Sequence, residues 1–330
     1  MRESAHLSSR GWRLASEHAM TSSGTKPTIA VVICTYKRNE ALKTLLETLG
    51  ICVARLDGRA AVGVVVVDDT AEGQARPVVE KFEGVFELGI AYRISGRQNI
   101  SLARNLAIET GCEIADWTAM IDDDCEPVAD WLNAMLDTQQ RTGADAVTGT
   151  MVRRVPAGSP KWLTEEPFLD YGLQQFEDGA ELPLAATFNS MISSRWLKDH
   201  PTIRFRPDLG VTSGEDMVFY GAAHAAGLKI RYSQKGYVYE NEPPSRATLS
   251  YQLRAFFWHG NSTYVTSVRN GVGPFRMFLR GANSLRKAIS RPVIRLLRGE
   301  RPQLRYCLAS VLHASGMMIG VCGVRLHHPL

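Results

Sequence analysis

The sequence lacks a glycine-rich phosphate-binding loop. Neither G-x-G-x-x-G nor G-x-x-x-x-G-K occurs among its 330 residues, although 28 of them are glycine. Such loops hold the phosphates of dinucleotides and nucleoside triphosphates against backbone N–H groups. Their absence weighs against a dinucleotide-binding protein and against a P-loop protein.

Cysteine spacing typical of zinc or redox sites is also missing. The six cysteines include no C-x-x-C pair. This pattern suits reduced thiols in a cytosolic protein better than a disulfide framework. The first 26 residues have no apolar core of signal-peptide length, so we expect no secretion and a disordered leader over residues 1–26.

Apolar runs and helical spacing alternate along the chain. The runs 28–34 and 61–67 are typical of strands buried on both faces, and four leucines between them recur at helical spacing up to Gly50, the expected helix end. A later helix has Ser101 as its expected N-cap and Gly111 as its expected end. Further helices are expected over 77–82, 101–111 and 128–136, and further strands over 90–94, 117–121 and 146–150. The pattern predicts an α/β fold with an open, doubly wound, mostly parallel sheet flanked by helices.

Acidic residues follow two of the predicted strands. Asp68 and Asp69 come after the second strand, and Asp122, Asp123 and Asp124 come after the strand over 117–121. Ligands of open α/β sheets bind beyond the carboxyl ends of the strands. Because side chains alternate along a strand, Asp122 and Asp124 can face one pocket. We therefore expect Mg²⁺ or Mn²⁺ there, bridging to a substrate diphosphate.

Acids at such positions also have a purely structural explanation. Carboxylates are favoured at the beginning of a helix, where they cap N–H groups and complement the helix dipole. Neighbouring aspartates also form turns. Both interpretations stay open at this point for the triplet and for the pair Asp68 and Asp69.

Six segments, taken together, resemble the family 2 glycosyltransferases, which have the GT-A fold. They occur in the order of that family over about residues 28–260, and they read VVICTYKRNEALKTLLETL, VVVVDDTAEG, NISLARNLAIE, MIDDDCEPVADWL, FNSMISSRW and GEDMVFYGAAHAAG. Two further stretches, PKWL and ENEPPSRATLSYQLRAFFWHGNS, resemble transferases of succinoglycan-type exopolysaccharide synthesis.

The resemblance implies how a nucleotide-sugar donor is held. Thr35 and Tyr36 would bind the nucleotide base, with Tyr36 stacking on it, and Asp69 would contact uracil. Arg104 and Asn105 would flank the donor diphosphate. UDP-glucose is the donor expected from the family.

The resemblance also implies the metal ligands and the general base. The D-x-D motif aligns with Asp122 and Asp124, so Asp124 would be the direct metal ligand and Asp122 would meet the ribose or metal-bound water. Asp123 lies between them on the donor side. The late E-D pair aligns with Glu215, on the acceptor side, and Asp216, the base. The expected reaction is metal-dependent and inverting; a helix cap is the alternative role for Asp216.

The acceptor side and the mode of transfer are expected from two other regions. Trp162 and Trp196 would stack on acceptor sugars, unless they are core residues. Processive family members carry Q-x-x-R-W, whereas residues 252–258 read QLRAFFW, so we expect transfer of a single sugar. Arg254 and His259 are candidates for contact with the leaving diphosphate, although a histidine among aromatics more often packs.

The C-terminal part combines basic and apolar residues. Residues 276–305 contain nine Lys or Arg and one acid, and the apolar run 306–324 follows. We expect a GT-A domain over 27–265 and a helical extension over 266–330 that attaches to the inner face of the plasma membrane from the cytoplasm. A solvated basic face is the alternative. A lipid-linked acceptor would account for membrane attachment. The basic stretch could also bind nucleic acid, but no aromatic stacking module accompanies it, so we expect no nucleic-acid partner.

Two rival functions stay open. A nucleotidyltransferase shares the sheet, the acidic site and the nucleotide, but usually has a basic, glycine-rich loop near the first strand, and TYKRNE lacks glycine. A non-catalytic sugar-binding relative would be expected to have lost the base or a metal ligand, whereas Asp124 and Asp216 are both present.

Overall fold

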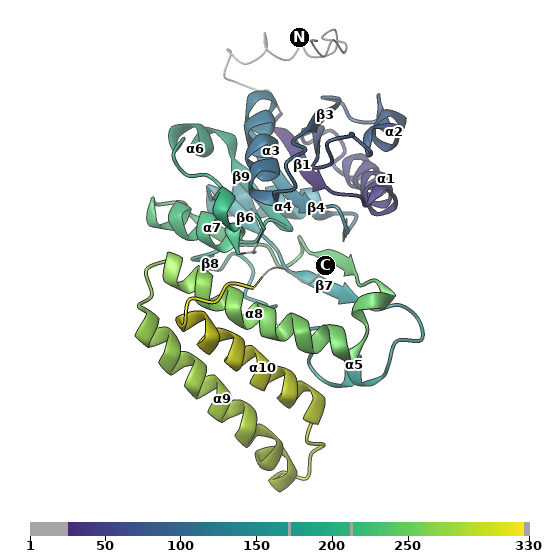
Figure 1. Cartoon of the computed structure of the whole chain (residues 1–330). Helices are drawn as coiled ribbons and strands as arrows, with labels where there is room; N and C mark the ends of the chain where they lie inside the picture. Colours follow the sequence, from purple (N-terminus) through teal and green to yellow (C-terminus); the bar gives the residue numbers. More distant parts are fainter. Residues whose placement is uncertain (1–25, 171–172, 212–213, 327–330) are drawn as a thin grey trace.

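The computed structural model describes residues 26–170, 173–211 and 214–326, so the leader expected over residues 1–26 falls outside it except for Lys26. Within the described residues, eight strands form one open sheet in the order β3-β2-β1-β4-β9-β6-β10-β8 (Figure 1). Its first four strands run parallel, and they are β1 (Thr28–Thr35), β2 (Ala61–Asp68), β3 (Ile90–Ile94) and β4 (Trp117–Asp122).

The other half of the sheet is mixed. β9 (Asn189–Ser193) runs antiparallel to both β4 and β6 (Ala146–Thr148). β10 (Ile230–Tyr232) pairs parallel with β6, and β8 (Glu181–Leu182) closes that edge antiparallel. The sheet is thus mostly parallel, and the predicted α/β class is confirmed.

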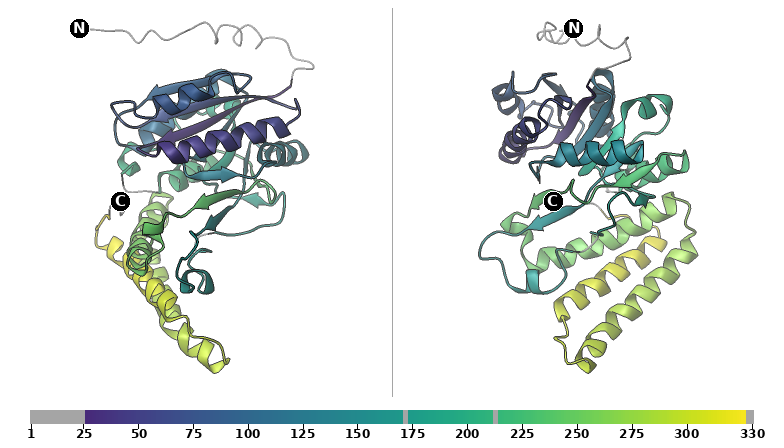
Figure 2. Two further views of the ribbon diagram at one scale, coloured as in Figure 1. Left: turned by 90° about the vertical axis from the view of Figure 1, so that its right-hand side faces the viewer. Right: turned by 180° about the vertical axis from the view of Figure 1, so that it is seen from behind.

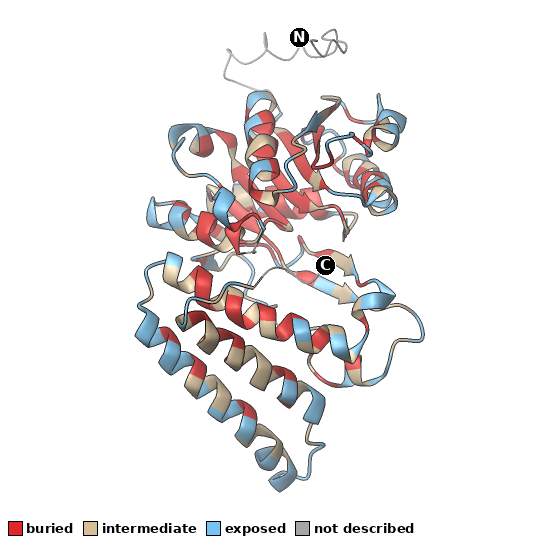
Figure 3. Ribbon diagram, viewed as in Figure 1, coloured by how far each residue is buried: buried red, intermediate tan, exposed pale blue. Residues whose placement is uncertain are grey.

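Helices cover both faces of the sheet because the central strands bury side chains on each face. In β1, Val31 belongs to one buried cluster and Val32 to the other, and Figure 3 shows buried residues concentrated along these strands. α1 (Asn39–Arg55) and α4 (Trp131–Thr142) pack on the first face, with the short α2 (Arg76–Val79) and η1 (Glu80–Phe82) beside them. The second face carries α3 (Ile100–Ile114), α6 (Ser194–Asp199) and α7 (Glu215–Ala225).

Ends of α1 and α3 differ from the sequence prediction. α1 continues through Gly50, because its buried face extends beyond that residue and outweighs the ~1 kcal/mol that an internal glycine costs relative to alanine. The N-cap of α3 is Asn99, whose side chain accepts a hydrogen bond from the first turn, and not Ser101. Gly111 lies inside α3, where a Cβ would come within 2.8 Å of Val32 Cγ1. This glycine therefore permits close packing on β1 and does not end the helix.

A second, three-stranded sheet lies beside the end of β4. Its order is β5-β11-β7, formed by β5 (Cys125–Pro127), β11 (Val238–Asn241) and β7 (Met151–Arg154). Because β5 follows the acidic triplet directly, α4 begins at Trp131, later than the expected 128. The triplet is therefore held between the two sheets.

Three long helices complete the described chain. They are α8 (Leu249–Arg269), α9 (Pro274–Leu297) and α10 (Leu304–Val321), and α10 lies between the other two (Figures 1 and 2). The boundary expected between residues 265 and 266 falls inside α8, so the helical part begins at Leu249. Among helices of the described residues, α10 alone is long and apolar enough to cross a membrane, with a mean hydropathy of 1.3.

Small residues bring α10 close to α8. A Cβ on Gly316 of α10 would overlap the Phe257 carbonyl oxygen of α8, and one on Gly320 would overlap the ring of Tyr264. A Cβ on Gly260 of α8 would in turn overlap a carbonyl of α10. The G-x-x-x-G pair of α10 is thus used inside the chain, against α8.

Candidate active site

The acidic triplet lies where β1 and β4 end side by side. Their parallel pairing places Cys34 opposite Asp122. Thr35, the next residue of β1, donates a 2.8 Å hydrogen bond from Oγ1 to Asp123. α4 begins only after Asp130, so the triplet does not cap a helix. The arrangement is that of a ligand site at the carboxyl edge of a sheet.

Arg38 neutralises two acids of the triplet. Its Nη1 donates to Asp123 at 3.0 Å and to Asp124 at 2.7 Å. Burial raises the pKa of Asp123 to about 6, with Arg38 opposing the rise and Asp124 adding to it. Burial and the charge of Asp122 also raise the pKa of Asp124. The sequence analysis gave Arg38 no role. The feature that could have identified it is a basic residue in the TYKRNE segment, at a position where phosphate-binding folds often have glycine.

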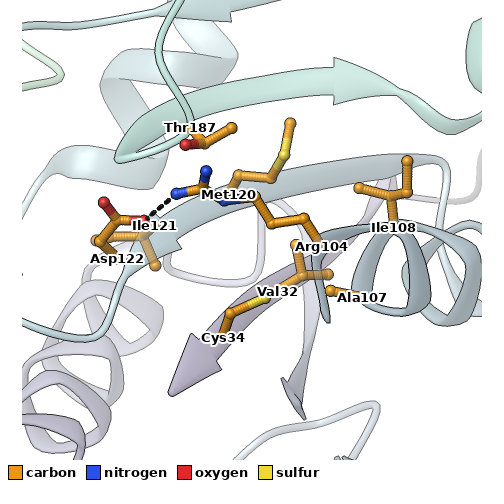
Figure 4. Close-up of a pocket in the computed structure, with 9 residues that line it drawn as sticks. All are labelled: Val32, Cys34, Arg104, Ala107, Ile108, Met120, Ile121, Asp122 and Thr187. Atoms are coloured by element: carbon orange, nitrogen blue, oxygen red, sulfur yellow. Dashed lines mark hydrogen bonds and ion pairs between the residues drawn. The ribbon is translucent and has the colours of Figure 1, made fainter. Parts of the chain in front are cut away.

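Arg104 joins the third acid to the late E-D pair. From α3 its guanidinium donates to Asp122 at 3.0 Å and also to Glu215 at the beginning of α7. Its side chain is 11% exposed. Burial alone would lower the pKa of Arg104, but Asp122 and Glu215 raise it. Figure 4 shows the Arg104–Asp122 pair lining a small cavity together with Cys34 and Thr187.

Asp216 occupies the second position of α7, next to Glu215. The N-cap is Gly214, which has φ of 89° and lies where a Cβ would overlap Thr266 of α8. Burial and the charge of Glu215 raise the pKa of Asp216 to about 7. Within the described residues, Oε2 of Glu215 is buried without a hydrogen-bond partner. A carboxyl group with a pKa near neutral pH is suited to proton transfer, which favours Asp216 as a base. The alternative role as the helix N-cap is taken by Gly214.

The two acids after β2 organise the loops around the sheet edge. Asp68 is buried and accepts four hydrogen bonds, two of them from Thr70, which agrees with the turn-forming interpretation. Asp69 accepts hydrogen bonds from the N–H groups of Arg97, at 3.0 Å, and Asn99, at 2.7 Å. It therefore fixes the segment that leads into α3.

The end of β1 also presents an aromatic ring. Tyr36 is 36% exposed, and the Lys37 ammonium lies 5.1 Å from its ring centroid. Lys37 has φ of 57°, which turns the chain sharply between β1 and α1. A partly exposed ring at this edge has a face on which a base can stack.

Three predicted residues are used in packing instead. Asn105 exchanges hydrogen bonds of 2.8 and 2.9 Å with the backbone of Phe205, so both ends of its amide are engaged away from the triplet. Because β9 is antiparallel to β4, the following Trp196 lies beside the amino end of β4, stacked on His200. Trp162, in α5 (Trp162–Glu165), packs edge-on in an aromatic cluster with α8 and α10. These contacts do not support acceptor stacking by either tryptophan.

Helix α8 passes the beginning of α7. Its Ser262 and Thr266 lie against Gly214. His259 precedes Ser262 by one turn on the same helix face, so it keeps its place as a candidate near the leaving group. Arg254 is exposed and, five residues earlier, projects from a different face of the helix.

An ion cluster adjoins Asp124 through the second sheet. The antiparallel pairing of β5 and β11 places Glu240 opposite the residue that follows Asp124. Glu240 lies 3.3 Å from Arg153 and 3.4 Å from Arg246. Burial and the neighbouring Glu242 raise the pKa of Glu240 to about 7. The sequence analysis assigned no role to these residues, because only the strand pairing brings them to the triplet.

The donor set fits a hard divalent cation in part. Among the described residues, no three His, Cys, Asp or Glu side chains are arranged to hold a metal. The Arg38 guanidinium, however, places a positive charge on Asp123 and Asp124, and Asp124 is the expected direct ligand of the cation. Mg²⁺ and Mn²⁺ commonly take one or two carboxylates from the protein and further oxygens from substrate phosphates. The residues present are compatible with that mode.

Known proteins share this sequence pattern. The family described as glycosyl transferase family 2 matches residues 30–200. The succinoglycan biosynthesis protein ExoM of Rhizobium meliloti is 29% identical over 303 residues, 90% of this chain and 94% of that protein. The glucosyl-dolichyl phosphate glucuronosyltransferase of Haloferax volcanii is 26% identical over 246 residues, 72% of this chain and 76% of that protein.

Solved structures share the fold. TarS 1-349 of S. aureus has a TM-score of 0.51 and 18% identity, covering 87% of this chain and 91% of that one. The same protein in complex with UDP-GlcNAc has a TM-score of 0.50 and 16% identity, with the same coverage. GalNAc-T7 with UDP, GalNAc and Mn²⁺ has a TM-score of 0.50 and 13% identity, covering 73% of this chain and 52% of that one. The expected GT-A fold is confirmed.

Proposed function

The chain belongs to glycosyl transferase family 2, and from this premise we propose that it transfers a single hexose, from UDP-glucose as the expected donor, to a lipid-linked or oligosaccharide acceptor in exopolysaccharide or cell-surface glycan synthesis. The similarity to a succinoglycan biosynthesis protein supports the pathway class. The UDP complexes of the fold relatives support a uridine nucleotide.

In this proposal the donor lies along the carboxyl edge of the sheet. Tyr36 stacks on the base and Asp69 contacts uracil at the far side of the edge. Asp122 and Asp124 would hold Mn²⁺ or Mg²⁺ on the diphosphate side of the site, with Asp124 as the direct ligand. When bound, such an ion supplies Lewis-acid stabilisation of the charge on the leaving diphosphate. Arg104 supports Asp122 from the side facing α3.

Asp216 acts as the general base. Its carboxylate takes the proton of an acceptor hydroxyl while that oxygen forms a bond to the anomeric carbon of the donor. The anomeric C–O bond breaks, and its electron pair leaves with the nucleoside diphosphate. A single displacement inverts the anomeric centre, so an α-linked donor gives a β-glycoside. Glu215, whose Oε2 is buried without a hydrogen-bond partner among the described residues, is proposed to orient the acceptor.

One observation carries the proposal. Arg104 bonds to Asp122 at the end of β4 and to Glu215 at the beginning of α7. One guanidinium therefore lies between an acid of the donor side and an acid of the acceptor side. These two residues, Asp122 and Glu215, are 93 positions apart in the chain. A reaction between a donor and an acceptor needs both sets at one place.

The test combines a donor screen with one variant. We expect release of UDP, dependent on Mn²⁺ or Mg²⁺ and abolished by excess EDTA. Asp216→Asn should bind the donor normally but transfer at least roughly 10²-fold more slowly, the scale of a lost general base. Full activity in EDTA would exclude the metal role of Asp124. Release of pyrophosphate instead of UDP would identify a nucleotidyltransferase, and near-normal transfer by the variant would direct the search for the base to Glu215.

The acceptor is proposed to be presented at the inner face of the plasma membrane, on which the protein lies through α9. That helix exposes Ile289, Val293 and Leu297 by 62%, 57% and 84%, and a shallow apolar groove runs between it and α10. Basic residues flank this face, and clusters of this kind are attracted to anionic lipid. Part of the basic stretch instead serves the chain itself, in contacts made by Arg291, Arg295, Arg301 and Arg305.

A further inference from the structure

Arg38 and Arg104 hold the acidic triplet in different ways. The Arg38 side chain is 43% exposed, whereas that of Arg104 is 11% exposed. Arg38 bridges Asp123 and Asp124 with a single nitrogen, Nη1. Arg104 is enclosed between β4, α3 and α7 by Asp122 and Glu215. Only Arg38 can leave its carboxylates without opening the core.

The backbone around Arg38 is not part of a regular element. Lys37 before it has φ of 57°, and Arg38 itself, with φ of −126° and ψ of 47°, precedes the first helical residue of α1. Its side chain makes no capping hydrogen bond to α1. Among the described residues, its guanidinium is held by hydrogen bonds to the two carboxylates, at the point where the proposed cation would bind Asp124.

We propose that Arg38 is an internal cation of the donor site: it occupies the carboxylates until a divalent ion and the nucleotide arrive together, and it then pairs with the donor diphosphate. This inference rests on the proposed function. A divalent ion alone must displace a guanidinium that already neutralises Asp124. A diphosphate offers that guanidinium new partners, since arginine pairs well with phosphate oxygens. Metal and nucleotide should therefore bind cooperatively, with Arg38 as the coupling residue.

The experiment measures Mn²⁺ affinity without turnover. Free Mn²⁺ is titrated by electron paramagnetic resonance against wild type and Arg38→Gln, each with and without UDP. Without UDP, the variant should bind Mn²⁺ about five- to tenfold more tightly, because the competing cation is gone. With Mn²⁺ present, the variant should bind UDP more weakly by a similar factor, so the coupling between the two ligands shrinks.

Arg59→Gln is the matched control. Arg59 also bridges acceptors, with Nη1 at 2.7 Å from Asn133 and Nη2 at 2.6 Å from Asp137, and its side chain is 39% exposed. It lies in the turn between α1 and β2, where it contacts the surface of α4, and its replacement should leave both affinities unchanged.

The outcomes separate the two proposals. If wild type binds no Mn²⁺ even with UDP, the metal site itself fails. If wild type binds Mn²⁺ with UDP but Arg38→Gln binds Mn²⁺ equally or more weakly without UDP, Arg38 is only a structural tie and the internal-cation role is wrong. A thermal melt shows whether Arg38→Gln is folded and gives a second measure of Mn²⁺ binding. Mn²⁺ alone should raise the melting temperature of Arg38→Gln more than that of wild type, and the reverse order would also overturn the inference.

Discussion

At the residue scale, the pKa values of the site's carboxyl groups depend on burial and on the charged groups beside them. Asp216 is flanked by Glu215 and shielded from water, so its pKa rises to about 7, although Arg104 opposes the rise. Asp123 lies deeper and is tied to Thr35 and Arg38. The same residue type therefore has different tasks at two positions of the site, and variants should separate them.

The first residue-scale prediction concerns pH. Asp216 must be ionised to accept a proton, so kcat/KM for transfer should rise about tenfold per pH unit below pH 7 and level off above it. Initial rates measured between pH 5 and pH 9 test this. Asp208→Asn is the control, because Arg206 holds the pKa of Asp208 below its usual range, and its profile should match wild type. A rate that falls with rising pH through 7 would contradict a carboxylate base.

The second prediction separates the middle acid from the last. Asp124→Asn should abolish metal-dependent donor binding with little change in stability, because its side chain is 21% exposed at the site. Asp123→Asn removes a buried charge that Thr35 and Arg38 compensate, so it should lower the free energy of unfolding by about 1–3 kcal/mol. Donor titration and chemical denaturation measure the two effects. The opposite assignment would mean that the D-x-D register is shifted by one residue.

At the element scale, three packed helices support the beginning of α7. Gly214 needs both a left-handed conformation and the absence of a side chain, because α8 lies against it. α8 is in turn covered by α10 through glycines on both helices. The position of Asp216 therefore depends on the C-terminal helices, although they lie outside residues 30–200, which match the family.

A single methyl group tests this packing. Gly316→Ala would drive a Cβ into the Phe257 carbonyl oxygen, so the helices must separate, and we expect a loss of about 1–3 kcal/mol of stability together with slower transfer. Gly273→Ala is the control, since a Cβ there meets nothing within 4 Å and φ is −60°. Denaturation and transfer assays on both variants suffice. Equal stabilities would show that α8 and α10 are not closely packed.

At the scale of the whole molecule, the catalytic sheet and the proposed membrane surface lie on different parts of the structure. α9 extends away from the sheet, and Figure 2 shows it on the outside of the helical layer. Met277 of α9 and Met317 of α10 belong to a buried cluster that includes Val218 of α7. Deleting residues 276–330 would therefore damage the catalytic part as well as remove the basic surface.

Substitutions on the outer face of α9 test membrane attachment more cleanly. Ile289→Ser with Val293→Ser should reduce flotation with liposomes that contain anionic lipid, and high salt should weaken binding of wild type. Ile51→Ser is the control, because Ile51 is similarly exposed, at 55%, on α1. Transfer to a soluble acceptor should be unchanged in both. Flotation that is insensitive to the α9 substitutions and to salt would exclude this surface.

The sequence by itself determined the sheet and the location of its acidic edge. Continuous β-branched runs such as residues 61–67 bury both faces of a strand, and acids directly after them must lie at the sheet edge. Local spacing did not determine helix ends at glycine: Gly50 and Gly111 lie inside helices, because packing against the sheet outweighs propensity.

Only the tertiary structure decided which charges meet. Arg38 precedes α1 and Arg104 lies within α3, yet they compensate the same triplet. Glu240 adjoins the triplet through a strand pairing of residues more than 100 positions apart. Trp196 and Asn105 are excluded from the triplet for the same reason, since strand direction and a backbone contact, neither visible in local sequence, place them elsewhere. Sequence periodicity determines local secondary structure, over one or two helical turns or one strand. Contacts between residues far apart in the chain form only when the whole core is buried.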